Sequence, residues 1–322
     1  MTSHHPADAG QGTPGRRPLR RGRRRTRRVA AALLTAVVLL IADAALLAFR
    51  IDRLDVPLTD APGTTWVVVG LDSRTDLPAG APVADFGTAD DVPGSRADVV
   101  VVLRETKGGV SVLSIPRDVV VTTATGPGRL ALTWLDGPQS TVDALCTLGI
   151  PTDHLVSVDL AGFAAVVDAA GGLDVDVPAP VRDPAAGLLL PEAGRQHVDG
   201  ATALALVRSR HPERLVDGHW APAPVDPDGR ASAAGTVLSA LASTARGSVA
   251  RPWRLQPMAW AASGALTVDD GTSSLELASL ATQDVGPVQV LPVGGPRGGT
   301  AARFPTAETG AAVAAAGLSC RR

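Results

Sequence analysis

The sequence predicts a mixed α/β domain arranged around a central sheet and preceded by one apolar helix. Short runs rich in Val and Leu alternate with longer segments of helical pattern between residues 65 and 316, and this alternation is typical of α/β folds. Gly- and Pro-rich stretches separate the segments at loop-like intervals, and the sequence has no internal repeat. These features favour one domain over two. A long apolar run before the first strand pattern predicts the additional helix.

The N-terminal region combines a basic arm with this apolar run. Nine arginines against one aspartate give residues 1–28 a formal charge of +8, which leaves −10 on residues 29–322 because the whole chain carries −2. Residues 29–49 are all apolar or small except Thr35 and Asp43. A helix of this length can cross about 30 Å of hydrocarbon, so the sequence predicts a transmembrane helix.

The arginines before this helix predict its orientation. Basic flanks stay in the cytoplasm, so residues after Arg50 are expected outside it, with residues 50–64 as a stalk and residues 65–322 as an extracytoplasmic domain. A cleaved signal peptide is the alternative, because the Ala-rich stretch 42–48 could allow cleavage. The apolar run exceeds the roughly 7–15 residues of a signal peptide's apolar region, which favours a single-pass membrane protein.

Periodicity and turn signals place the elements of the domain. Asp159 and Asp199 are expected to cap helices, because a carboxylate there accepts a backbone N–H of the first turn, and Gly171-Gly172 is expected to end the earlier helix. The expected strands are 65–71, 99–103, 110–115, 154–158, 173–177 and 288–291. The expected helices are 141–148, 159–170, 200–207, 230–245, 274–282 and 306–316. Residues 75–95, 178–196 and 211–228 are expected to be loops, because they are rich in Pro, Asp and Gly.

Two cysteines, Cys146 and Cys320, are present in the chain. An exported location permits a disulfide between them, which would tie the C-terminus to the body of the domain. Cys146 fits equally well as a small buried residue on helix 141–148. Both interpretations stay open on the sequence alone.

Charged residues stand at both ends of a predicted hairpin. Arg96 and Asp98 precede its first strand, and Arg117 and Asp118 follow its second. Guanidinium groups suit phosphate, and carboxylates hold Mg²⁺ beside a phosphate. Asp72 ends a neighbouring strand, and further arginines lie at breaks between elements: Arg74, Arg208, Arg210 and Arg230. Any one of these arginines could be an ordinary solvated or ion-paired residue, so composition alone indicates only an exported domain that binds an anion.

An ordered set of motifs narrows this interpretation. The chain contains Gly70-x-Asp72-x-Arg74, Arg96-x-Asp98, Ser114-Ile115-Pro116-Arg117-Asp118, Val167-Asp168-Ala169-Ala170-Gly171-Gly172, Asp199-Gly200-x-x-Ala203-Leu204 and Arg208-Ser209-Arg210. In this order the motifs resemble those of the LytR-CpsA-Psr family, and the resemblance covers residues 66–241. The basic arm and single span also fit the usual topology of that family.

The resemblance implies phosphotransfer outside the membrane. Members of the family move a glycopolymer from a polyprenyl-pyrophosphate carrier to peptidoglycan and form a phosphodiester link. When the family's site residues are matched to this chain, the resemblance implies that arginines bind the pyrophosphate. It also implies that Arg96, Arg117 and Asp98 take part in catalysis. Asp72 and Asp98 would coordinate Mg²⁺, with Asp98 the better candidate for a base. The pyrophosphate-binding arginines would be Arg74, Arg96, Arg117, Arg208, Arg210 and Arg230.

The remaining implications concern the lipid and the partners. An apolar tunnel for the prenyl chain is expected between helices 159–170 and 230–245, although these faces could equally be ordinary core. No nucleotide is required, since the carrier's phosphoanhydride stores the energy. Nucleic acid is not an expected partner, because the domain carrying the motifs is acidic and exported.

The chain departs from the family pattern at two places. A Lys-x-Asn segment is replaced by Arg129-Leu130-Ala131, and a glutamine four residues after Arg230 is replaced by Ala234. Losing a phosphate-contacting amide could cost about 1–3 kcal/mol. The sequence therefore leaves two functions open: a working transferase, or a non-catalytic member that binds the lipid carrier or a cell-wall partner.

Overall fold

The computed structural model describes residues 20–59, 61–73, 93–223 and 229–320, and the chain divides into two units, Met1–Leu46 and Leu47–Arg322. Helix α1 (Arg20–Arg50) contains the segment Arg27–Arg50, which is the one helix among the described residues that is long and apolar enough to cross a membrane. The apolar helix expected from the sequence is therefore confirmed. The expected loop at 75–95 lies almost wholly outside the described residues.

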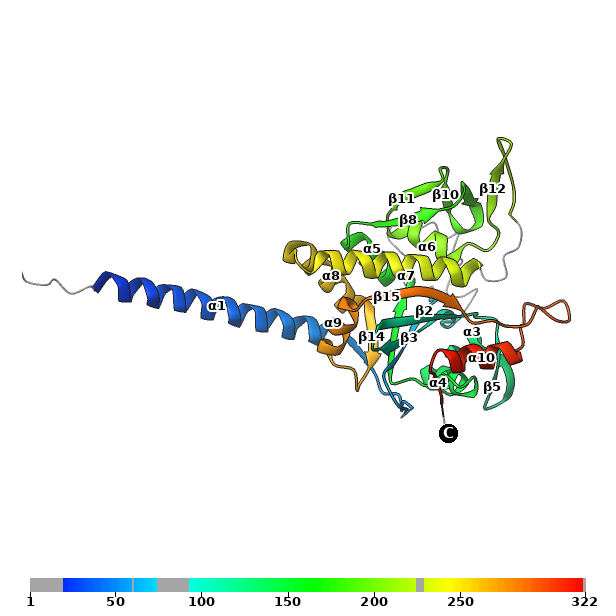
Figure 1. Ribbon diagram of the computed structural model, residues 1–322, viewed down its shortest axis with the longest axis horizontal. Helices are drawn as coiled ribbons and strands as arrows, with labels where there is room; N and C mark the ends of the chain where they lie inside the picture. The colour runs from blue at the N-terminus through cyan, green and yellow to red at the C-terminus, as the bar shows by residue number, and fades with distance from the viewer. Residues whose placement is uncertain (1–19, 60, 74–92, 224–228, 321–322) are drawn as a thin grey trace, which may run out of the picture. The chain divides into compact units, whose positions relative to one another are not determined.

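A seven-stranded mixed sheet forms the centre of the second unit, in the order β1-β14-β7-β2-β3-β4-β15 (Figure 1). Strands β2, β3 and β4 form an antiparallel meander, while β7 runs parallel to β2 and β15 runs parallel to β4. The strands are β1 (Asp52–Leu54), β2 (Thr65–Leu71), β3 (Ala97–Thr106), β4 (Gly109–Ile115), β7 (His154–Asp159), β14 (Leu266–Asp269) and β15 (Val285–Val290). This arrangement confirms the predicted mixed α/β class.

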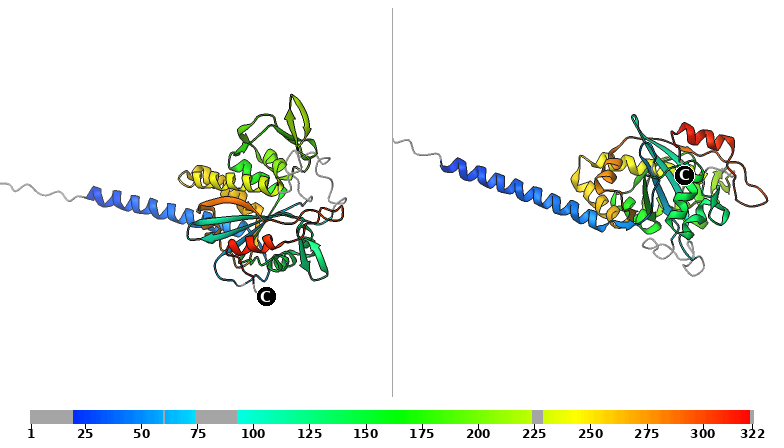
Figure 2. Two further views of the ribbon diagram at one scale, coloured as in Figure 1. Left: turned by 45° about the vertical axis from the view of Figure 1, so that its right-hand side comes forward. Right: turned by 90° about the horizontal axis from the view of Figure 1, so that it is seen from below.

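Alternating side chains bury both faces of this sheet. On β2, Val67 and Val69 belong to one core cluster and Trp66 to another, as the period of two along a strand requires. Helices α3 (Leu130–Thr133), α4 (Pro138–Thr147) and α10 (Ala307–Ala315) cover one face, and α5 (Leu160–Ala169), α6 (Gly200–Arg208), α7 (Gly229–Ser248) and α8 (Pro252–Ala265) lie on the other side (Figures 1 and 2). The sheet is thus the middle layer of three.

The predicted caps form as expected. The Asp159 carboxylate accepts a hydrogen bond from the Gly162 backbone N–H at 2.6 Å, and the Asp199 carboxylate accepts one from Thr202 at 2.8 Å. Gly200 begins α6 where it crosses α5, and a Cβ at this position would collide with the Ala164 carbonyl. The absence of a side chain at Gly200 therefore sets how closely the two helices pack.

Two expectations of irregular structure, at residues 178–196 and 211–228, were wrong, and one helix was not expected. Residues 178–196 contain β9 (Val181–Asp183), β10 (Leu188–Leu190) and most of β11 (Gly194–Val198), which pairs with β8 (Leu173–Val177). Residues 211–228 contain the hairpin of β12 (Glu213–Val216) and β13 (His219–Pro222), which joins β9 and β10 in a second sheet. Helix α8 was not predicted, because Pro252 and Pro257 obscured its pattern, although Pro252 stands at a first-turn position.

Both chain ends of the domain are fixed to its body. Strand β1, inside the segment expected to be a stalk, pairs in parallel with β14. Cys146 on α4 forms a disulfide with Cys320, and the Cys320 backbone N–H also donates to the Gly149 carbonyl at 3.0 Å. This settles the alternative left open by the sequence in favour of the disulfide. The remaining expected helix, 274–282, is α9 (Ser274–Thr282).

Candidate functional site

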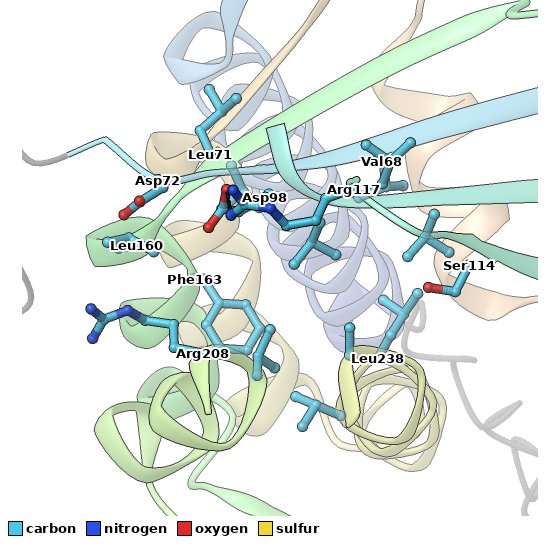
Figure 3. Close-up of a pocket in the computed structure, with 18 of the residues that line it drawn as sticks. Val68, Leu71, Asp72, Asp98, Ser114, Arg117, Leu160, Phe163, Arg208 and Leu238 are labelled. Carbon is cyan, nitrogen blue, oxygen red and sulfur yellow. Dashed lines mark hydrogen bonds and ion pairs between the residues drawn. The ribbon is translucent and has the colours of Figure 1, made fainter. Parts of the chain in front are cut away.

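A cavity of about 270 Å³ lies between the sheet and helices α5, α6 and α7. Its lining changes character along its length: charged side chains gather at one end, while valine, leucine and phenylalanine line the rest. In Figure 3, Asp72, Asp98 and Arg117 lie together, Arg208 lies nearby, and Phe163 and Leu238 lie in the apolar part. The cavity can therefore hold a molecule with a charged group at one end and a hydrocarbon at the other.

The two candidate acids are placed side by side by the backbone. The Arg96 carbonyl accepts hydrogen bonds from the Asp72 N–H at 2.9 Å and from the Asp98 N–H at 3.0 Å. These bonds coincide with an irregularity in the register of β2 and β3 between Gly70 and Leu71. Bulges of this kind redirect side chains at strand ends. The local backbone thus brings both Asp72 and Asp98 into the lining of the cavity.

Arginines from two distant parts of the chain meet at Asp98. Arg117, which directly follows β4 and Pro116, is bonded to Asp98 Oδ1, and Arg210 Nη2 lies 3.1 Å from Asp98 Oδ2. The Arg117 and Asp98 side chains are 14% and 20% exposed, so water screens this pair only partly. Two guanidinium groups therefore converge on a half-buried carboxylate, in the place where an incoming anion would need positive charge.

The aspartate of the Ser-Ile-Pro-Arg-Asp motif, Asp118, has a supporting position. Asp118 Oδ1 lies 3.6 Å from Arg117 Nε and 3.2 Å from Arg129 Nη1. Asp118 therefore helps to orient Arg117 and draws Arg129 toward the same edge of the sheet. Arg129 replaces the family's lysine and brings its charge close to the site, but it does not line the cavity.

A buried aspartate that the sequence analysis missed holds the Arg208-Ser209-Arg210 segment. Asp183 Oδ2 accepts hydrogen bonds from the Ser209 hydroxyl at 2.9 Å, the Arg210 N–H at 2.7 Å and the His211 N–H at 2.8 Å. Burial acts to raise the pKa of Asp183, but the hydrogen bonds from His211, Ser209 and Arg210 outweigh it and lower the pKa below its ordinary value. Asp183 lies in a region taken for a loop, so no pattern singled it out.

Arg303 is a second cavity residue that the sequence analysis missed. It lines the cavity together with Arg117 and Asp118. Its N–H donates to the Asp118 carbonyl at 3.0 Å, and its carbonyl accepts from the Val120 N–H at 2.8 Å, so the C-terminal segment is fixed beside the end of β4. No motif surrounds Arg303 in the sequence, and only the fold brings it to the site.

The apolar part of the cavity is formed by the helices expected to line a tunnel. Leu160, Phe163 and Val166 come from α5, and α7 contributes several small and branched residues. Those of α7 are Ala234, Val237, Leu238 and Leu241. Ala234, which replaces the family's glutamine, therefore places a methyl group against the cavity.

The other predicted site residues are distributed as follows. Asp72, Asp98, Arg117, Arg208 and Arg210 all line the one cavity, so the fold brings these five predicted residues together. Arg96 is not among the described residues that line the cavity. Its Nε is buried and has no hydrogen-bond partner within the described part of the chain. Arg74 lies outside the described residues. Arg230 lies in the first turn of α7, and its side chain is also outside the described part of the chain. The roles of these residues stay predictions.

Comparison with known proteins decides the family. A model of the LytR_cpsA_psr family matches residues 55–219, which is more than half of the chain. The chain belongs to the LytR-CpsA-Psr family. The family segment contains the two acids, Arg117 and the Arg208-Ser209-Arg210 motif of the cavity.

Several relatives within the family have names connected with the cell wall. The chain is 35% identical over 265 residues to the probable cell wall biosynthesis protein LcpB of Corynebacterium glutamicum, which covers 77% of this chain and 58% of that protein. It is 31% identical over 145 residues to the polyisoprenyl-teichoic acid–peptidoglycan teichoic acid transferase TagV of Bacillus subtilis, covering 42% and 37% of the two chains. The chain thus spans little more than half the length of LcpB, and 47% of LcpA from the same organism.

Solved structures share the fold. A LytR-Csp2A-Psr enzyme from Actinomyces oris superposes with a TM-score of 0.69 at 36% identity, covering 84% of this chain and 98% of that one. The structure described as TagT bound to LI-WTA superposes with a TM-score of 0.54 at 19% identity, covering 78% and 87%. At that identity the second likeness supports the fold alone.

Proposed function

We propose that this protein transfers a glycopolymer from a polyprenyl-pyrophosphate carrier to peptidoglycan and forms a phosphodiester link. One observation carries the proposal: a single cavity joins a cluster of arginines and carboxylates to an apolar lining. A polyprenyl pyrophosphate has the same two parts, a strongly anionic group and a long hydrocarbon. Family relatives named as teichoic acid transferases support the same reaction class.

The arginines would hold the pyrophosphate. Arg117, Arg208 and Arg210 line the charged end of the cavity, and their planar guanidinium groups can donate pairs of hydrogen bonds to phosphate oxygens. Phosphoryl transfer is catalysed mainly by positioning and by electrostatic stabilisation of the charge on the phosphate oxygens. Arg303 adds a further positive charge at the same end.

Asp72 and Asp98 would hold Mg²⁺ together with the pyrophosphate oxygens. These two residues fit a magnesium ion, because Mg²⁺ is typically held by one or two carboxylates plus substrate phosphates. The backbone N–H groups of both aspartates donate to the same Arg96 carbonyl, which keeps the two residues close together. Among the described residues no three His, Cys, Asp or Glu side chains are grouped so that they could hold a metal ion, so the substrate would have to complete the coordination. When bound, the ion would neutralise part of the charge on the phosphate oxygens.

The acceptor reaction follows from the same geometry. The acceptor hydroxyl oxygen attacks the phosphorus that carries the glycopolymer, the bond from that phosphorus to the bridging oxygen breaks, and polyprenyl monophosphate leaves. The pyrophosphate would compete with Asp98 for Arg117 and Arg210. Asp98 would then be released from both guanidinium groups and could accept the proton of the hydroxyl.

The location of the protein forms part of the proposal. The segment Arg27–Arg50 would anchor the chain in the cell membrane, with the arginine-rich N-terminus in the cytoplasm and the folded domain outside. This topology would bring the cavity to the side of the membrane where peptidoglycan is assembled.

Release of polyprenyl monophosphate tests the proposal directly. The full chain would be incubated with Mg²⁺, a labelled polyprenyl-pyrophosphate-linked glycan and peptidoglycan. We expect Mg²⁺-dependent release by the wild type and a loss of at least about 100-fold in Arg117→Ala, because electrostatic stabilisation of the transferred group is a major catalytic term. Arg195→Ala is the matched control, since Arg195 is 79% exposed and pairs with Asp174 outside the cavity.

A second candidate function is favoured by Ala234 and Ala131. Ala234 lines the cavity without an amide, and Ala131 is fully buried, so neither replaces the hydrogen bonds of the family residues. Tight binding of the carrier without any release would identify a non-catalytic, lipid-binding protein. Carrier binding by Arg117→Ala as tight as that of the wild type would contradict both functions.

A further inference from the structure

Helix α8 presents two exposed tryptophans in a single stripe. Trp253 is 72% exposed and Trp260 is 44% exposed. They are seven residues apart, which is almost two turns, so they lie on the same side of the helix. Val249, just before α8, is 49% exposed, and Leu275, at the start of α9, is 83% exposed. Helices α8 and α9 lie beside each other at one end of the domain in all views (Figures 1 and 2).

The end of the apolar segment is attached to this same helix. Arg50, the last residue of α1, stacks its guanidinium group on Trp260 at 4.0 Å from the ring centroid. Its Nε donates to the Ser263 hydroxyl at 3.2 Å. Gly264 leaves space for the guanidinium, because a Cβ there would lie 2.5 Å from Arg50 Nη2. The position of Arg50 against α8 is therefore set by three neighbouring residues.

We propose that the α8 patch, defined as Val249, Trp253, Trp260 and Leu275, lies in the interfacial layer of the lipid bilayer. The inference rests on the membrane anchor of the proposed function. The 24 residues of Arg27–Arg50 span about 36 Å as a helix, slightly more than the hydrocarbon thickness of about 30 Å. Arg50 is thus at or just beyond the hydrocarbon boundary, and α8, which contacts it, is held at the same level.

The chemistry of α8 fits this location better than it fits water. Tryptophan is enriched at membrane interfaces because its ring is apolar and its N–H is polar. Arg251 and Arg254 are also exposed and can interact with the anionic headgroups of a bacterial membrane. An exposed face that combines tryptophans with arginines is expected of a helix lying in the interface.

The patch would also determine how lipid reaches the cavity. Leu266 directly follows α8 and lines the cavity beside Leu238 and Leu241. The C-terminal end of α8 is therefore followed directly by a residue of the apolar cavity lining. Docking of α8 would let a polyprenyl chain pass from the bilayer to the cavity without exposing its length to water.

Tryptophan quenching by lipid tests the patch without requiring catalysis. The full chain would be assembled in nanodiscs of phosphatidylglycerol and phosphatidylcholine, with or without bromine on the upper acyl chain. We expect brominated lipid to quench wild-type emission, and Trp253→Phe combined with Trp260→Phe to lose most of that quenching. Trp220→Phe is the matched control, because Trp220 lies in β13 against Arg182, at 4.9 Å from its guanidinium, and should not contribute.

The outcomes separate this inference from the proposed function. Equal quenching of the wild type and the double tryptophan variant would overturn the docking of α8. The same result together with normal release of polyprenyl monophosphate would leave the transferase function intact. A chain that does not co-assemble with nanodiscs would overturn both the anchor and the docking. Far-UV circular dichroism of the double variant would verify that its fold is retained.

Discussion

Asp183→Asn should weaken both the folded domain and its site, because one carboxylate oxygen fixes the segment that carries Arg208 and Arg210. The substitution keeps the size of the side chain but removes its charge. It either turns an amide N–H toward three donors or leaves a weaker neutral oxygen facing them. These donors are Ser209 Oγ, Arg210 N and His211 N, at 2.7–2.9 Å.

The magnitude follows from the number of bonds. At about 1 kcal/mol net for each of the three hydrogen bonds, we expect the free energy of unfolding to fall by about 3 kcal/mol. Urea unfolding at pH 7 measures this change. Asp176→Asn is the matched control, because Asp176 is an exposed aspartate on β8 and should leave the unfolding midpoint nearly unchanged.

The difference in unfolding free energy between the wild type and Asp183→Asn should depend on pH in a defined direction. The pKa of Asp183 is lower in the folded protein than its ordinary value of 3.8, so its stabilising effect is complete above that value. As the pH falls below about 3.8 and through the lowered pKa, the wild type loses this stabilisation and the difference from Asp183→Asn should narrow. A difference below about 0.5 kcal/mol at pH 7, or one that does not narrow at acidic pH, would refute the reasoning.

Three further predictions concern the disulfide, a helix crossing and the cavity. Replacing Cys146 and Cys320 by serine opens a loop with a sequence separation of 174 and should lower the free energy of unfolding by up to about 5 kcal/mol; an unchanged thermal midpoint would contradict this. Gly200→Ala should cost about 2–3 kcal/mol in urea unfolding by pressing a methyl group against the backbone of α5, whereas Gly310→Ala, which has open space, should not destabilise the domain. Leu238→Trp fills part of the apolar cavity, so the KM for a long-chain polyprenyl donor should rise roughly tenfold at similar kcat, as expected for lost uniform binding. An equal rise for a short-chain donor would argue against a prenyl-binding role.

The sequence predicted the strongly patterned parts of the fold well. Strand β2 has the bounds expected, and the Asp159 and Asp199 caps form because capping depends on residues only two or three positions away. The second sheet was missed because its strands are only three or four residues long, and their pairing rather than local propensity stabilises them. Helix α8 was missed because Pro252 and Pro257 interrupt its helical sequence pattern. In the fold the helix also contacts Arg50, which no local pattern could reveal.

In the candidate site, too, locally encoded residues were predicted and residues that depend on tertiary packing were missed. The predicted hairpin is enough to place Asp98 near Arg117, because antiparallel pairing of β3 and β4 brings the start of the first strand beside the end of the second. Asp183 and Arg303 could not be found, because one supports the site through backbone N–H groups and the other reaches it from the C-terminal segment. Local spacing carries no information about contacts that depend on how distant segments pack.

The sequence by itself determined the apolar helix, the mixed α/β class and the family motifs, because these depend on hydrophobic periodicity and on residues close together in the chain. Only the tertiary structure decided that Arg210 meets Asp98, that Cys146 bonds to Cys320 and that Arg50 rests on α8. Each of these contacts joins residues more than 100 positions apart. Their formation depends on the packing of the whole domain, which brings such segments together only when the core is complete.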